Sequence, residues 1–248
     1  AIGIGAIIGG GIFVLTGTAA YYHAGPALAL SFVVAGVACI FAALCYAEFA
    51  SMLPVEGSAY AYAYGTVGEV FAWLIGWGLV LEYMMGAMTV AVSWSGYFNK
   101  MLKMFGMHIP ANLVSDPISY GGEGFAFNLP AFIIVLIVTF ILAKGTKEAA
   151  STNNLIVILK TSVVLFIIVV GAFYINMDNL TPFIPEETTI IGPHGEPEVA
   201  YGFKGIIMGA AAVFFAYIGF DAVSTQAAEA IDPKKDIPFA IIASLLIC

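Results

Sequence analysis

Charged residues are scarce in this chain. Aspartate, glutamate, lysine and arginine make up 10% of its 248 residues, and hydrophobic residues make up 61%. Soluble globular domains carry roughly 25% charged residues, so this composition excludes a chain whose main solvent is water. Within a bilayer, backbone amides are paired only inside helices or closed barrels, and the long apolar runs here favour helices.

Cysteines and other ligand-type residues are equally sparse. The three cysteines lie in apolar segments without the spacing of a metal site or a disulfide framework, so we expect neither a metal nor a cofactor. The formal net charge of −8 argues against nucleic acid as a partner. A membrane enzyme would need a nucleophile with its base, or a ligand cluster such as His-Glu-x-x-His, and a channel would need a ring of like polar residues. Neither pattern is present, and we expect no catalytic residue.

Six apolar stretches are each long enough to form a membrane-crossing helix, since about 20 residues span the hydrocarbon core. We therefore expect an all-α, multi-pass protein of the cell (plasma) membrane. Because the chain opens within one apolar run and stops soon after another begins at Pro238, we expect a single transmembrane domain fragment, residues 1–248, that lacks an N-terminal tail and later helices. The six stretches cover residues 2–22, 26–53, 68–98, 126–143, 155–176 and 205–230.

Glycine interrupts the first and the sixth stretch near the middle, at residues 9–13 and 216–220. A Gly-x-x-x-Gly pattern lies upstream of each interruption, at Gly5 and at Gly205. Glycine breaks at corresponding places in two halves indicate a transporter whose site lies at the repeat interface. For either helix taken alone, the alternative is that the glycines only allow close helix packing.

Groups of motifs recur in order along nearly the whole chain. They are Gly9, Gly11, Ile12 and Phe13; Tyr46, Ala47, Glu48, Phe49, Pro54, Gly57, Tyr60 and Tyr62; Gly76, Trp77, Leu81, Glu82 and Tyr83; Gly145, Glu148, Asn153, Asn154 and Lys160; residues 214–221; and Glu229, Asp232, Pro233 and Pro238. Together they resemble the motifs of the amino acid-polyamine-cation (APC) superfamily, specifically a bacterial form of its cationic amino acid transporter branch. The resemblance implies a LeuT-type fold with inverted repeats, in which helices 1 and 6 are discontinuous. One departure is Gly10, where the family usually has a small hydroxyl residue.

The resemblance implies that substrate binds where helices 1 and 6 unwind. An unwound turn leaves amides and carbonyls unpaired at helix ends, and their partial charges match the two ends of a zwitterion. Phe215 and Tyr217 are candidates to cover the bound side chain. We expect the substrate carboxylate on backbone amides of Gly9, Gly10, Gly11 and Ile12, and the ammonium on carbonyls of Ile7, Phe215, Ala216 and Ile218.

Two charged residues, Lys160 and Glu82, interrupt otherwise apolar stretches. An intramembrane charge is a functional hypothesis by default. In the resembled branch, a lysine at this place occupies the position of a sodium ion in sodium-coupled relatives, near carbonyls of helix 1, which implies that Lys160 carries a coupling proton. The alternatives are a structural ion pair or a lysine that extends to the membrane surface. Glu82 is open between an architectural role and proton handling, and a pair with Lys160 would stabilise the charged lysine.

The resulting functional prediction is a proton-coupled symporter of L-amino acids, with small neutral ones favoured, that works by alternating access. Sodium coupling, or exchange of amino acids or polyamines, is the alternative among transporters. The expected partners are the amino acid, the proton and the lipid bilayer. Whether a small membrane-protein subunit accompanies the chain is left open.

Overall fold

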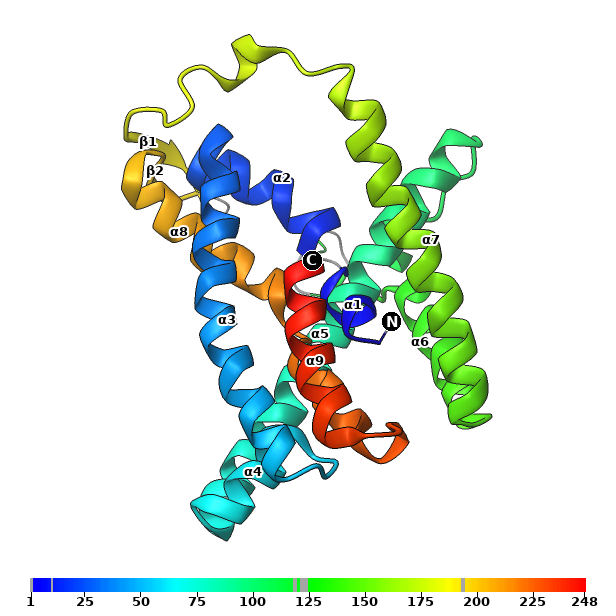
Figure 1. The fold of residues 1–248 in the computed structure, drawn as a ribbon. Coiled ribbons are helices and arrows are strands. Elements are labelled where there is room, and N and C mark those ends of the chain that lie inside the picture. Colours follow the sequence, from blue (N-terminus) through cyan, green and yellow to red (C-terminus); the bar gives the residue numbers. More distant parts are fainter. Residues whose placement is uncertain (1, 10, 118–119, 121–124, 193–194) are drawn as a thin grey trace. The chain divides into compact units, whose positions relative to one another are not determined.

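The computed structural model describes residues 2–9, 11–117, 120, 125–192 and 195–248 (Figure 1). The chain forms two compact units. The first unit joins Ala1–Gly76 to Asn153–Cys248, and the second unit is Trp77–Thr152.

The described residues are mostly helical. The α-helices are α1 (Ile2–Ile7), α2 (Thr16–Ala19), α3 (Leu28–Met52), α4 (Ser58–Thr66), α5 (Glu69–Met104), α6 (Leu129–Ala143), α7 (Thr146–Ala172), α8 (Gly202–Phe214) and α9 (Pro233–Ile247). Two π-helical turns, η1 (Gly11–Leu15) and η2 (Ala20–Ala24), flank α2. Short 3-10 segments are η3 (Gly25–Ala27), η4 (Ala111–Leu113), η5 (Met177–Leu180), η6 (Phe215–Tyr217) and η7 (Asp221–Glu229).

Within the described part of the chain, four segments are long and apolar enough to cross a membrane: Gly3–Met52, Glu69–Met104, Ala150–Ala172 and Gly202–Ala227. The first has 50 residues, which at 1.5 Å per helical residue is about twice what one crossing needs. Its chain turns at Gly25, whose φ of 59° suits glycine and which Pro26 follows. The shorter apolar helix Leu129–Ala143 completes the predicted set, and the prediction of a multi-pass helical membrane protein is confirmed.

Three features were not predicted from the sequence. Helix α5 continues to Met104 and α7 begins at Thr146, because intrahelical hydrogen bonding continues into polar residues where an apolar run has already ended. Helix α4 lies between the second and third predicted stretches. Strands β1 (Thr188–Ile191) and β2 (Pro197–Ala200) form an antiparallel hairpin between the fifth and sixth predicted stretches, with Thr188 opposite Ala200.

In the first unit, helix α3 packs along both α8 and α9 (Figure 1). Its buried side chains are small and recur about every turn, as at Ala35, Cys39 and Ala43, so neighbouring helices can approach closely. Ser31 on the same helix donates its hydroxyl to the Ile206 carbonyl of α8 at 2.9 Å. A Cβ on Gly209 would lie 2.7 Å from that hydroxyl oxygen, so this glycine serves the packing of α8 on α3.

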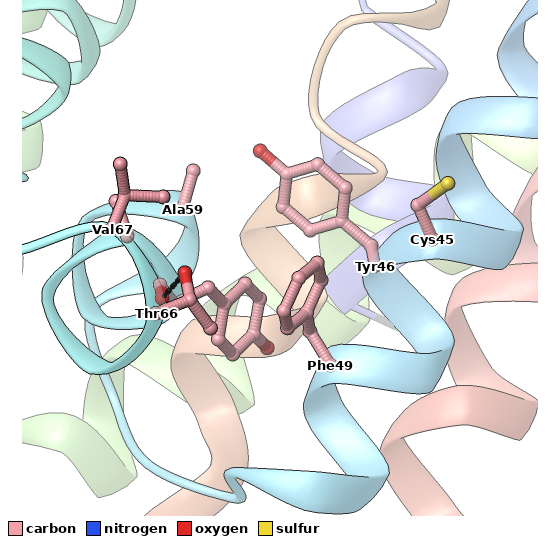
Figure 2. A pocket seen from close by; sticks show the side chains of 8 residues that line it. Cys45, Tyr46, Phe49, Ala59, Thr66 and Val67 are labelled. Carbon is pink, nitrogen blue, oxygen red and sulfur yellow. Dashed lines mark hydrogen bonds between the residues drawn. The ribbon is translucent and has the colours of Figure 1, made fainter. Parts of the chain in front are cut away.

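Helix α4 rests on the end of α3 through aromatic rings. The ring centroids of Phe49 and Tyr62 are 5.3 Å apart and stacked, and those of Tyr46 and Tyr62 are 5.9 Å apart and edge-on. Figure 2 shows these rings around a pocket of about 240 Å³ between the two helices. The lining is Cys45, Tyr46, Phe49, Ala59, Tyr62, Ala63, Thr66 and Val67.

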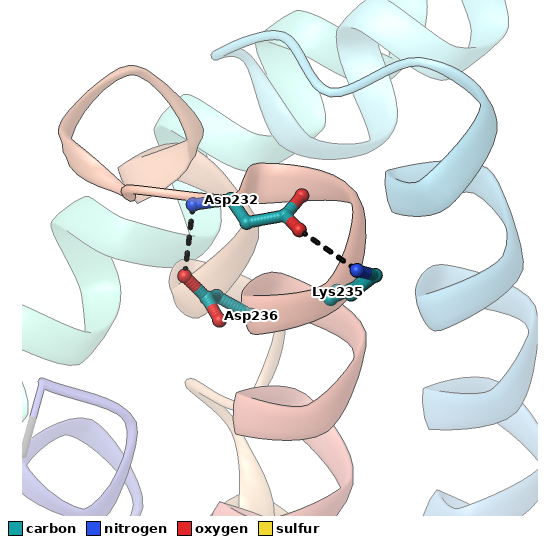
Figure 3. Close-up of polar contacts among 3 residues, drawn as sticks. All are labelled: Asp232, Lys235 and Asp236. Atoms are coloured by element: carbon teal, nitrogen blue, oxygen red, sulfur yellow. Dashed lines mark hydrogen bonds and ion pairs between the residues drawn. The ribbon is translucent and has the colours of Figure 1, made fainter.

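The start of α9 is set by polar contacts (Figure 3). The Asp232 backbone N–H donates to Asp236 Oδ2 at 3.0 Å, and Lys235 Nζ lies 3.3 Å from Asp232 Oδ2. Pro233 occupies the first helical turn, where its missing N–H is not needed. The helix therefore begins at Pro233, five residues before the Pro238 at which the apolar run begins.

In the second unit, Asn128 joins α5 to α6. Its side-chain oxygen accepts the hydroxyl of buried Ser95 at 2.6 Å and also the Ala131 N–H at 3.1 Å. The second contact caps the α6 N-terminus, which otherwise would leave an amide unpaired in an apolar environment.

Candidate substrate site

The first helix break lies between α1 and η1. Helix α1 ends at Ile7, the Ile8 N–H still donates to the Ile4 carbonyl at 2.9 Å, and π-helical structure resumes at Gly11. Gly10, a predicted substrate contact, lies outside the described residues. The last carbonyls of α1 have lost their intrahelical partners, so they carry partial negative charge and accept other donors.

Lys160 supplies those donors. Its Nζ donates to the carbonyls of Gly5 and Ile8, the second at 2.5 Å. The residue is half-buried and lies ten positions from the start and twelve from the end of the apolar segment Ala150–Ala172. The lysine therefore extends sideways to α1 from the middle of a crossing helix, and not along α7 to the membrane surface.

The second break lies between α8 and η7. Helix α8 ends at Phe214, the chain tightens into η6, and Ile218 then turns extended with ψ of 133°. Gly219 follows with φ of 114°, a conformation that side chains strongly disfavour. The predicted interruption at residues 216–220 thus coincides with a real change of backbone direction.

The two breaks contact each other. A Cβ on Gly219 would lie 2.8 Å from the Ala6 Cβ, and a Cβ on Gly11 would overlap the backbone and side chain of Ala216. Gly9 differs, since the nearest atom to a Cβ there is the Ala6 carbonyl oxygen at 3.6 Å, an ordinary contact. Gly11 and Gly219 therefore serve helix contact, whereas Gly9 has space beside it.

A cavity of about 310 Å³ lies beside this junction, within the first unit. Its volume is near the lower end of the range for small-molecule sites. The described lining carries no carboxylate and no ammonium group. The lining residues are Ile7, Ile8, Ile12, Phe32, Val164, Ile168, Ala216, Tyr217, Ile247 and Cys248.

Some of the predicted contacts belong to this lining and others do not. Ile7, Ile12 and Ala216 line the cavity, whereas Phe215 and Ile218 lie on the break outside the lining. The lining also contains six residues that were not predicted from the sequence: Ile8, Phe32, Val164, Ile168, Ile247 and Cys248. Val164 and Ile168 follow Lys160 by four and eight residues, so helical spacing alone places them on the lysine's face.

Glu82, the other charged candidate, lies on α5 in the second unit. Its role and its relation to Lys160 stay predictions. The structure gives the positions of the described residues that were named from the sequence. Their roles in binding substrate and protons are likewise predictions.

Polar residues tie the far side of the second break to α4. Asp221 is buried, its Oδ2 accepts the Ser58 hydroxyl at 3.4 Å, and its backbone carbonyl accepts the Ser224 hydroxyl at 2.6 Å. Burial raises the pKa of the nearby Tyr62 hydroxyl, and a hydrogen bond with Ser224 offsets part of that rise. Asp221 therefore connects η7 to α4, and is not simply solvated at a membrane surface.

Two discontinuous helices that meet beside a small apolar cavity define the membrane transporter class. The chain belongs to the amino acid permease family, whose model matches residues 1–248. The resemblance to the APC superfamily is thereby confirmed, and the family is one of transporters and not of enzymes.

Curated relatives carry different printed names. The chain is 51% identical over 247 residues to the branched-chain amino acid permease BcaP of Bacillus subtilis (strain 168), and 48% identical over 247 residues to the methylthioribose transporter of the same organism. Each alignment covers 100% of this chain and 50% of the relative. It is also 38% identical over 254 residues to the chloroplastic cationic amino acid transporter 9 of Arabidopsis thaliana, with 100% of this chain and 41% of the relative covered. The chain thus spans about half the length of the two Bacillus subtilis relatives.

Proposed function

We propose that the complete protein is a proton-coupled symporter of the cell membrane that carries an L-amino acid with an uncharged side chain. The observation that carries the proposal is the position of Lys160, whose ammonium group binds the loose end of α1 beside the cavity. The protein has a LeuT-type fold with inverted repeats and works by alternating access, in which one bundle moves against the other around a fixed site.

The substrate's charged ends bind backbone at the two breaks. Its carboxylate binds amides around Gly9, where a ligand has room, and its ammonium binds carbonyls left free near Ile7 and Ala216. Backbone groups recognise the zwitterion that all amino acids share. Selection among amino acids then depends on the side chains that line the cavity.

The lining favours an aliphatic side chain as cargo. A cationic side chain would lie in the cavity without a carboxylate partner among the described lining residues, and burying an unpaired charge is costly. Methylthioribose, the cargo in the name of one relative, has several hydroxyl groups that an apolar lining leaves without hydrogen-bond partners. The branched-chain cargo in the name of another relative fits this lining better.

Proton coupling follows from the charge of Lys160. A protonated amine binds the Gly5 and Ile8 carbonyls through charge-assisted hydrogen bonds, which are roughly twice as strong as neutral ones. Loss of the proton weakens both bonds and releases the end of α1. The protonation state of one side chain thereby biases whether the first break is held or free.

Uptake into proteoliposomes tests this mechanism. With the wild-type protein, we expect an inward proton gradient to drive accumulation of leucine or alanine, and a sodium gradient to have no effect. Lys160→Gln is expected to abolish proton-driven accumulation, because glutamine cannot carry a proton. Lys235→Gln is the matched control, because its ion pair with Asp232 is exposed and contributes little to stability.

Counterflow exchange separates a coupling defect from a folding defect. Exchange of labelled for unlabelled substrate needs no net proton movement, so a folded Lys160→Gln protein should exchange without accumulating. Proton-driven accumulation at the wild-type level in Lys160→Gln would contradict the coupling role of Lys160. Sodium-driven uptake by the wild type would show sodium coupling in place of proton coupling.

A further inference from the structure

Tyr217 joins the second break to α3. It is the last residue of η6, and its hydroxyl donates to the backbone carbonyl of Phe32 at 3.0 Å. The two rings meet edge-on, with centroids 6.3 Å apart and planes at 66°. Both residues line the cavity, so this contact fixes the aromatic part of its wall.

Gly36 explains how Tyr217 fits against α3. It lies one turn after Phe32, and a Cβ at this position would be 3.1 Å from the Tyr217 hydroxyl oxygen and 3.4 Å from Cζ. Glycine inside a helix costs about 1 kcal/mol relative to alanine. Packing explains the glycine at this position, because any side chain here would crowd the Tyr217 hydroxyl.

We infer that Gly36 and the Phe32 carbonyl together hold the Tyr217 ring in place, and that this ring sets the upper size of the substrate side chain. The inference rests on the proposed function and deepens it. Apart from Phe32, Tyr217 and Cys248, the lining is aliphatic and comes from several helices. A ring fastened to α3 at its hydroxyl cannot move aside for a larger ligand, so Tyr217 limits the available length.

Two substitutions release or displace the ring in different ways. Tyr217→Phe keeps the ring and removes the hydrogen bond, so larger side chains should be better tolerated. Gly36→Ala places a Cβ 3.1 Å from the hydroxyl oxygen and crowds the ring while leaving its size unchanged, so larger side chains should be less well tolerated. One methylene group in an apolar pocket changes selectivity by about tenfold or more, which sets the size of shift to expect.

The experiment measures how well alanine, valine, leucine and phenylalanine compete with labelled alanine in proteoliposomes containing the complete protein. Tyr217→Phe is expected to raise the affinity for leucine relative to alanine by about tenfold, and Gly36→Ala is expected to lower it. Tyr201→Phe is a matched control, since its hydroxyl donates to the Tyr21 carbonyl at 3.2 Å and it is not among the lining residues. Gly86→Ala on α5 is the control for Gly36→Ala, because nothing lies within 4 Å of a Cβ there.

The possible outcomes distinguish a failure of the size limit at Tyr217 from a failure of the proposed transport function. If the wild type takes up none of the four amino acids, the proposed function fails. If the wild type takes them up and Tyr217→Phe keeps the wild-type ratio of leucine to alanine, the size-limit inference fails and the transport function stands. Tyr217→Phe preserves the ring volume, so it decides the question even where Gly36→Ala does not fold.

Discussion

The two helix breaks meet at one cavity but are held in different ways. The first break ends in free carbonyls that a titratable side chain, Lys160, binds from α7, and space remains beside Gly9. The second break has Gly219 packed against Ala6, and a neutral hydrogen bond connects Tyr217 to α3. Under the proposed mechanism, protonation of Lys160 switches the first break, whereas packing and backbone geometry fix the second.

The largest expected effect is at Gly219, where two penalties coincide. Gly219→Ala would place a side chain at φ of 114° and also within 2.8 Å of the Ala6 Cβ. Backbone strain costs about 1–3 kcal/mol and overpacking costs about another 1–3 kcal/mol. We expect the apparent thermal midpoint to fall sharply, or the folded protein to be lost.

Gly68→Ala is the matched control for that prediction. Gly68 has φ of 113°, and nothing lies within 4 Å of a Cβ there. Gly68→Ala therefore reports the cost of backbone strain alone. The additional loss of stability in Gly219→Ala measures the contribution of the contact between the two breaks. Equal losses in the two variants would show that this contact does not stabilise the protein.

The next comparison lies within the first break itself. Gly11→Ala must separate the break from Ala216, so we expect a stability loss of about 1–3 kcal/mol. Gly9→Ala meets only an ordinary contact at 3.6 Å, so its stability should stay near that of the wild type while substrate affinity falls. Thermal shift with and without amino acid distinguishes the two, because a bound ligand raises apparent stability. A Gly9→Ala protein that binds substrate as the wild type does would remove Gly9 from the site.

The positions of the crossing segments and of both breaks could be predicted from sequence because their signals are local. A run of apolar residues predicts a membrane helix, and glycine in the middle of the run indicates where that helix is interrupted. The intramembrane charge at Lys160 is equally visible, although its placement beside carbonyls of helix 1 came from the family resemblance. None of these inferences requires knowledge of which helices touch.

The rest of the site depends on packing between distant segments. The Tyr217 hydroxyl and its acceptor on Phe32 are 185 residues apart, and no local pattern joins them. The contact of Gly11 with Ala216 has the same origin, so the sequence alone left open whether these glycines serve a ligand or a neighbouring helix. Helix α4 was missed because its nine residues are too few for a membrane signal and are placed by aromatic contacts with α3.

The smallest expected effect tests the polar contacts on the far side of the second break. Ser58→Ala removes the 3.4 Å hydrogen bond to buried Asp221, and because that bond is long we expect a loss of about 0.5–1.5 kcal/mol in the free energy of unfolding. Ser162→Ala, which loses an exposed bond to the Ile158 carbonyl, should stay within about 0.5 kcal/mol. Neither variant should shift the pH dependence of uptake, since the hydroxyl groups removed do not titrate. A shifted pH profile in Ser58→Ala alone would place proton handling at Asp221 as well, and would end the distinction between a switchable first break and a fixed second one.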